Sequence, residues 1–198
     1  MVMAATNIPS FDDLYRQIEA LPEGITGEVL EPGVLRTMPR PGSAHRWAAT
    51  WCTDSLRGSN RVLRGTGWWI EVEAEIRLLR DRLVVPDLSG WRVERVPELP
   101  RENPITVVPD WCCEVLSPTT MRADRVLKLP IYVAAGVEWV WLVDPAARMF
   151  EVFRTVDGRA VLTLSAGADD VIAPPPFQTE IALEAWWLPD EGGVRQGD

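Results

Sequence analysis

Two acidic residues stand in otherwise apolar stretches of this chain, a pattern that can hold a metal ion. Asp87 follows Val84-Val85-Pro86, and Glu114 lies inside the apolar run from Trp111 to Leu116. Burying a lone carboxylate costs several kcal/mol unless a cation accompanies it. Two carboxylates on adjacent strands can hold Mg²⁺ or Mn²⁺, which lowers the pKa of a bound water and neutralises phosphate charge. The pattern therefore predicts a divalent-cation site at Asp87 and Glu114.

A structural salt bridge is the second interpretation of Glu114. The segment that follows it carries Arg122 and Arg125, and either guanidinium could neutralise the carboxylate. Residue types alone leave the metal site and the salt bridge open.

Lysine usage draws attention to Lys128. The chain has 20 Lys plus Arg, and Lys128 is the only lysine among them. A compact ammonium differs from a planar guanidinium when it must orient a water or shift its pKa, and Lys128 falls on the helix predicted directly after Glu114. The alternative is an exposed ion pair with Asp124, four residues earlier on the same helix face. In either case we expect Lys128→Arg to change stability by well under ~1 kcal/mol.

Length and composition indicate a folded globular protein. With 198 residues the chain is about one domain, and we expect a single domain over 1–198 with 1–9 and 189–198 frayed. The formal net charge of -9 counts against a broad basic face for nucleic acid, although a bound divalent cation would supply positive charge where a phosphate sits.

The cysteines predict no structural metal site. Cys52, Cys112 and Cys113 cannot all pair within the chain, and we expect reduced core thiols. Structural zinc would need CxxC-type spacing with further Cys or His, whereas His45 is the only histidine. No apolar run approaches the ~20 residues that span a bilayer, and the first ten residues lack the features of a secretory signal. We therefore expect a cytoplasmic location.

Capping residues and hydrophobic periodicity predict the elements that position these side chains. Apolar residues at helical spacing after Ser10 predict a helix over 11–21, and a turn at Glu31-Pro32-Gly33 predicts a hairpin over 24–39. Helical spacing returns over 43–56.

The middle of the chain alternates between apolar and charged residues. Period two from Trp68 to Leu79 predicts one half-buried strand, paired antiparallel with Leu83–Val85 through the turn at 80–82. The proline-rich stretch 97–109 indicates a surface excursion. An apolar run over 107–116 predicts a central strand.

The C-terminal third predicts a helix followed by strands. Ser117 and the residues after it begin a helix that ends at Gly136, with a kink or break at Pro130. Further strands are expected over 137–143, 149–154, 159–164 and 181–187. The chain also has 10 tryptophans, which we expect to be core or interface anchors, with an aromatic platform for unpaired bases as the alternative.

The acidic positions lie in longer motifs that resemble a known family. The run 109–120, followed by Asp124, Lys128, Tyr132 and 141–145, resembles the signature of the Uma-two family of restriction-endonuclease-like proteins, in the PD-(D/E)xK nuclease superfamily. The segment 85–92 matches the family's first acidic motif, and 27–41 resembles its N-terminal hairpin. The resemblance implies an α/β (α+β) restriction-endonuclease-like fold, a mixed sheet flanked by helices, with Asp87 and Glu114 as metal ligands.

One position departs from the superfamily pattern. The pattern places a lysine two residues after the second acid, where this chain has Leu116. The resemblance implies that the lysine has migrated to Lys128 on the following helix. Glu28, His45 and Glu75 also match recurrent family positions.

Together these observations predict an Mg²⁺- or Mn²⁺-dependent endonuclease that acts on DNA. Asp87 and Glu114 would hold the metal, the backbone carbonyl of Val115 would be a third ligand, and Lys128 would hold the water or stabilise phosphate charge. A catalytically silent or partner-dependent binding module on the same fold is the alternative, and the acidic net charge favours it. We also expect a homodimer.

Overall fold

Two sheets of different size organise the chain, which a computed structural model describes over residues 8–38 and 40–189. The larger is a six-stranded mixed sheet in the order β10-β9-β8-β7-β6-β3. The smaller is a four-stranded sheet in the order β2-β1-β5-β4, and β11 pairs with β12. The predicted α+β class with a mixed sheet is confirmed.

The strands of the larger sheet are antiparallel except for β7 and β8, which run parallel. Its strands are β3 Trp68–Val72, β6 Leu88–Arg92, β7 Trp111–Val115, β8 Trp139–Asp144, β9 Met149–Val156 and β10 Arg159–Ala166. The remaining strands are β1 Thr26–Glu31, β2 Val34–Met38, β4 Ile76–Leu78, β5 Arg82–Val84, β11 Val171–Ile172 and β12 Ile181–Ala182.

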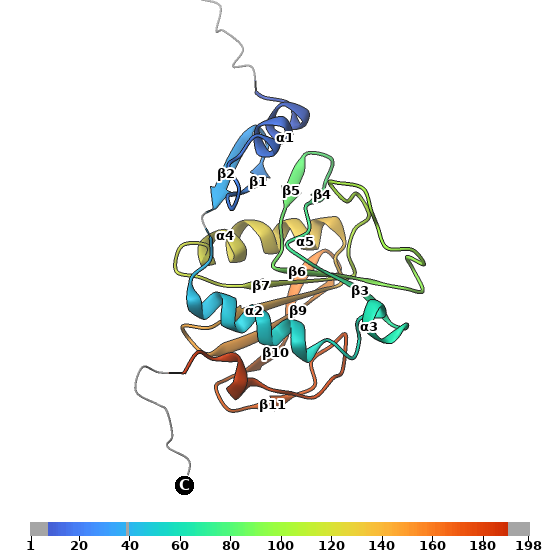
Figure 1. Cartoon of the computed structure of the whole chain (residues 1–198), viewed down its shortest axis with the longest axis vertical. Helices are drawn as coiled ribbons and strands as arrows, with labels where there is room; N and C mark the ends of the chain where they lie inside the picture. Colours follow the sequence, from blue (N-terminus) through green and yellow to red (C-terminus); the bar gives the residue numbers. More distant parts are fainter. Residues whose placement is uncertain (1–7, 39, 190–198) are drawn as a thin grey trace, which may run out of the picture.

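Helices cover both faces of the larger sheet. The helices and helical segments of the described residues are α1 Phe11–Glu19, α2 Ser43–Ser55, α3 Arg61–Arg64, α4 Met121–Ala123, the π-helical segment η1 Asp124–Lys128, α5 Leu129–Ala135 and the 3₁₀ segment η2 Leu183–Trp186, of which α1 packs on the smaller sheet. Figure 1 shows α2 on one side of the sheet and the α4–α5 segment on the other.

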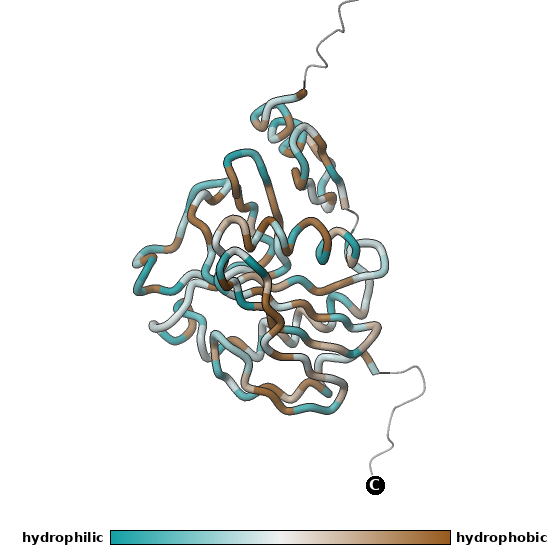
Figure 2. The backbone as a smooth tube through the Cα atoms, turned by 180° about the vertical axis from the view of Figure 1, so that it is seen from behind, coloured by the Kyte–Doolittle hydropathy of each residue, from teal (hydrophilic) through white to brown (hydrophobic). Residues whose placement is uncertain are grey.

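Alternate residues of β7 face two different cores. Cys113 packs with Cys52 of α2, whereas Cys112 packs with Tyr132 of α5. Strand side chains alternate between faces, so Glu114 points to the α5 side, as Cys112 does. Figure 2 shows hydrophilic colouring mainly on the outer loops, which fits this layered interior.

Most predicted elements are confirmed. Ser10 caps α1 in a capping box, the hairpin forms as β1 and β2, and β7 is a central strand. Burial raises the pKa of the Cys112 and Cys113 thiols well above their ordinary value, so both stay protonated core residues, as predicted. Among the described residues, no helix has the length and apolar character needed to cross a membrane.

The predicted single strand from Trp68 to Leu79 is wrong. The chain forms β3 in the larger sheet and β4 in the smaller one, and Glu73 between them has a φ of 52°. That left-handed backbone interrupts the pleat, so the two halves of one period-two pattern belong to different sheets.

Two further expectations need correction or fall outside the described residues. The segment 181–187 begins as the short strand β12 but continues as the 3₁₀ segment η2. Fraying was predicted for 1–9 and 189–198, and most of both ranges lies outside the described residues.

Candidate active site

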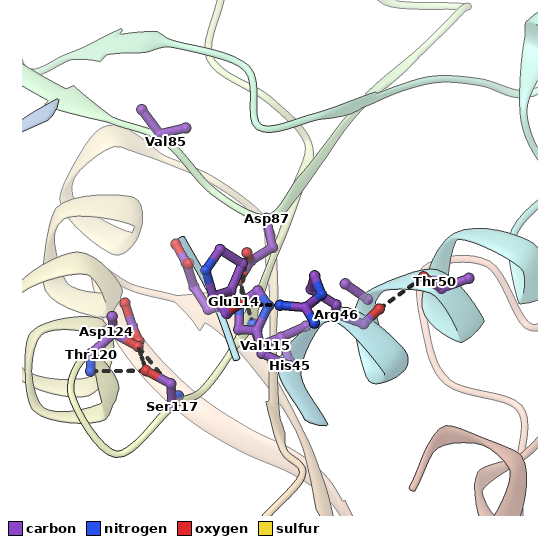
Figure 3. A network of polar contacts seen from close by, with 12 residues as sticks. His45, Arg46, Thr50, Val85, Asp87, Glu114, Val115, Ser117, Thr120 and Asp124 are labelled. Atoms are coloured by element: carbon purple, nitrogen blue, oxygen red, sulfur yellow. Dashed lines mark hydrogen bonds and ion pairs between the residues drawn. The ribbon is translucent and has the colours of Figure 1, made fainter. Parts of the chain in front are cut away.

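The two predicted carboxylates come together at the ends of adjacent strands. Register pairs Leu88 of β6 with Cys113 of β7, so one residue further Asp87 lies opposite Glu114. The N–H of Val115 donates to Asp87 Oδ2 at 2.7 Å. Both acids line one cavity of about 400 Å³, and Figure 3 shows them close together.

Lys128 lies on the floor of the same cavity. Its side chain is only 2 % exposed, and its Nζ lies 3.1 Å from Glu114 Oε2, 2.8 Å from Glu28 Oε1 and 3.5 Å from Asp124 Oδ1. The alternative of an exposed ion pair with Asp124 is therefore wrong, because the pair forms in the interior. The expectation that Lys128→Arg is nearly neutral assumed a surface side chain, and that premise is wrong too, since a bulkier cation must fit a packed site.

The arginine alternative for Glu114 is also wrong. Arg125 pairs with Glu151, and Arg122 is exposed. Glu114 Oε1 instead accepts a hydrogen bond from the Tyr132 hydroxyl. Lys128 is thus the cation that accompanies the buried carboxylate.

The helix that carries Lys128 is distorted where the sequence contains a proline. Pro130 has no N–H to donate to the preceding turn, and the N–H of Leu129 bonds the carbonyl of Asp124, five residues earlier. The result is the π-helical segment Asp124–Lys128, a feature often found at functional sites. Asp124, Lys128 and Tyr132 are spaced by four and all are buried, a pattern that the sequence already contained.

Glu28 reaches the site from the N-terminal hairpin. Strand β1 pairs with β5 at Val29 and Leu83, which brings the neighbouring Glu28 close to Val85. The N–H of Val85 donates a hydrogen bond to Glu28 Oε1 at 2.7 Å. Glu28 is fully buried, and its Oε2 has no hydrogen-bond partner. An unsatisfied buried carboxylate oxygen is costly, so this oxygen fits a site that takes up a further donor or cation.

His45 meets Asp87 from the other face of the sheet. It lies in the first turn of α2, and its Nε2 is 2.9 Å from Asp87 Oδ1. Figure 3 shows His45 and Asp87 close together. Its Nδ1 is buried without a partner. The third family-like position, Glu75, lies outside the cavity and accepts a hydrogen bond from Tyr15 at 2.6 Å.

Burial and charge act against each other in this cluster. Burial raises the pKa of Glu114 well above its ordinary value, Lys128 opposes the shift, and the other carboxylates add to it. Burial also raises the pKa of Asp124. For Lys128, burial lowers the pKa, but Glu114, Glu28 and Asp124 outweigh it and hold the pKa well above the ordinary value.

Carboxylates outnumber cations here. We call Lys128 with Glu28, Asp87, Glu114 and Asp124 the Lys128 cluster. It sets four carboxylates against one ammonium. Such an excess is relieved by protons or by a divalent cation.

The donor set fits Mg²⁺ or Mn²⁺. A strand residue carries its N–H and C=O on the same edge, so the carbonyl of Val115 lies on the edge that faces Asp87. Among the described residues, no three His, Cys, Asp or Glu side chains already form a metal cage. Mg²⁺ does not need one, because it is bound through one or two carboxylates and keeps several waters.

Comparisons with known proteins identify the family of the chain and a solved structure of similar fold. The model of the Uma2 family, described as "Putative restriction endonuclease", matches residues 12–185. One solved structure, of a "putative nuclease belonging to DUF820" from Anabaena variabilis, has a TM-score of 0.70 and 21% identity. The match covers 90% of this chain and 97% of that chain, and at this identity it shows the fold alone. No curated protein matches the chain.

Proposed function

Because this chain belongs to the Uma2 family, we propose that it is a metal-dependent endonuclease that hydrolyses phosphodiester bonds in DNA. One observation carries the proposal: the Lys128 cluster sets four carboxylates, three of them buried, against one ammonium beside a cavity of about 400 Å³. A purely structural network has no need of that excess negative charge. A phosphodiesterase uses it to hold Mg²⁺ or Mn²⁺ beside the phosphate.

Asp87, Glu114 and the carbonyl of Val115 would hold the cation. When bound, it supplies a nucleophilic water at neutral pH and neutralises charge on the phosphate. His45 positions Asp87, because its Nε2 lies 2.9 Å from one carboxylate oxygen while the N–H of Val115 holds the other.

Lys128 acts as a charged donor rather than as a base. Its carboxylate partners hold its pKa well above the ordinary value, so the ammonium stays protonated at neutral pH. Glu28 and Asp124 hold the ammonium beside Glu114, where it can donate to the water or to a phosphate oxygen.

Mn²⁺ binding tests the proposal directly. Calorimetry on the wild type should show binding that Asp87→Asn abolishes, whereas Asp110→Asn, at the other end of β7, should leave it unchanged. Plasmid DNA or a single-stranded circular DNA, with Mg²⁺ or Mn²⁺, should be cut by the wild type and by Asp110→Asn, and neither should be cut by Asp87→Asn. Absence of Mn²⁺ binding by the folded wild type at millimolar metal would refute the proposal.

A catalytically silent binding module is the second candidate, and the partners of Lys128 favour it. An ammonium has three N–H donors, and three carboxylates already surround this one. A closed network of this kind needs no substrate. Nucleic-acid binding without cleavage would support this candidate, whether or not the protein binds Mn²⁺.

A further inference from the structure

A second cavity adjoins the first at Asp87. It measures about 250 Å³ and lies along α2, where Arg46, Thr50 and Thr53 line it. The two cavities share Pro41, His45, Glu73 and Asp87. A chain-like ligand whose phosphate sits at Asp87 therefore has space on both sides of that phosphate.

The first cavity is small, and the charged side chains at its base are buried. Residues 40–45, 117–120 and 145–146 are among those that line it. Its volume of about 400 Å³ is in the range of small-molecule sites, and Glu114 and Lys128 on its floor are each 2 % exposed. The body of a duplex cannot enter such a space, whereas the backbone of one flexible strand can.

The charge of the chain and the position of two arginines also favour an unpaired strand. The chain has a formal net charge of -9, unlike the basic face that usually marks duplex binding. Two exposed arginines, Arg40 in the first cavity and Arg46 in the second, form no salt bridge among the described residues. Nη1 of Arg46 donates to the carbonyl of Pro41 at 2.6 Å, which anchors the guanidinium where the cavities meet.

Arg46 is the side chain of the second cavity that can donate hydrogen bonds to a phosphate. The hydroxyls of Thr50 and Thr53 already donate to helix carbonyls at 2.8 Å, so they are left as acceptors. No tryptophan lines either cavity, and the alternative of an aromatic platform finds no support there. A DNA strand held in this way would be bound through its phosphate backbone.

We infer that the cleft takes single-stranded DNA, or an unpaired segment of a duplex, which runs past Asp87 and along α2 with a phosphate on Arg46. The assignment of the reaction rests on the proposed function, but the preference for an unpaired strand is a property of binding. Binding and cleavage can therefore be tested separately.

Binding is measured by fluorescence anisotropy in Ca²⁺, with a labelled 20-nucleotide strand and the same strand in a blunt duplex. We expect the single strand to bind at least about tenfold more tightly at equal salt. Arg46→Gln should weaken single-strand binding about five- to tenfold and reduce its salt dependence, as loss of one phosphate contact does. Arg159→Gln, an exposed arginine of β10 that lines neither cavity, is the matched control.

Equal or tighter binding of the duplex would overturn the inference, as would failure of both to bind or an effect of Arg159→Gln equal to that of Arg46→Gln. Cleavage in Mn²⁺ then separates the two proposals. If the single strand binds preferentially but neither substrate is cut, the proposed function fails and the inference stands. If the intact duplex is cut faster, the proposed function stands and the inference fails.

Discussion

The two ends of β7 each carry a group of charged residues, and the groups differ in balance. Beyond Val115 lies the Lys128 cluster, with four carboxylates and one ammonium. Before Trp111 lies the Asp110 cluster, in which Asp110 and Glu138 meet three arginines, Arg92, Arg95 and Arg154. There Arg95 lies 2.8 Å from Asp110, and Arg92 lies 2.9 Å from Glu138.

The difference separates a structural from a functional arrangement. The Asp110 cluster neutralises its acids, and its arginines are partly exposed, so it connects β6, β7 and β8 at little electrostatic cost. The Lys128 cluster keeps unpaired negative charge away from water, which is costly unless the site binds protons or a cation. Four predictions test this contrast.

The largest effect should follow removal of the single ammonium. Lys128→Met leaves three buried carboxylates without a cation and should cost about 3–5 kcal/mol in the free energy of unfolding. Arg95→Met should cost about 1 kcal/mol or less, because that side chain is 43% exposed and Arg92 remains beside Asp110. Urea denaturation of both variants at neutral pH without metal measures the difference. Similar losses would mean that the two clusters are energetically alike.

The same carboxylate-to-amide change should act in opposite directions at the two ends of β7. Asp110→Asn weakens the contacts with Arg92 and Arg95 and should cost about 1–3 kcal/mol. Glu114→Gln removes excess negative charge and should leave metal-free stability unchanged or raise it by up to about 1 kcal/mol. Urea denaturation in EDTA tests both variants, and a loss above about 1 kcal/mol in Glu114→Gln would contradict the charge imbalance.

Stability should depend on pH and metal together. Burial raises the pKa of Glu114 and Asp124, so the folded state binds protons more tightly than the unfolded chain. Metal-free stability should therefore fall as pH rises from the ordinary carboxyl pKa of about 4 through the raised values. Mn²⁺ competes with those protons, so its stabilisation should grow from about pH 5 to pH 8. Melting temperatures with Mn²⁺ or EDTA check this, and a metal effect independent of pH would argue against these ligands.

The smallest effect should come from the exposed rim of the Asp110 cluster. Arg154 is 50% exposed and lies 3.3 Å from Glu138, which keeps Arg92 as a partner. Arg154→Gln should change stability by less than about 0.5 kcal/mol and leave Mn²⁺ binding unaltered. A larger loss in denaturation would show that the balance of this cluster depends on all three arginines.

Local sequence patterns determined much of the fold. Ser10 with the apolar spacing behind it specifies α1, and the turn at Glu31-Pro32-Gly33 specifies the hairpin. The period-two alternation from Trp68 to Leu79 gave a wrong prediction, because the chain turns at Glu73 and its two halves, β3 and β4, lie in different sheets. Periodicity reports which side chains alternate, and it carries no information on which sheet receives the strand.

The sequence by itself indicated that Asp87 and Glu114 belong to one site, because Asp87 follows an apolar run, Glu114 lies inside another, and both fall in the motifs that resemble the family. Only the tertiary structure decided what surrounds them. Glu28 comes from the hairpin and His45 from α2, and neither position is linked to Glu114 by any local spacing. The burial of Lys128 was decided in the same way, since the side chain is interior only because β1, β7 and its own helix close around it. Charge balance in a protein interior depends on partners distant in sequence, and folding alone brings them within reach.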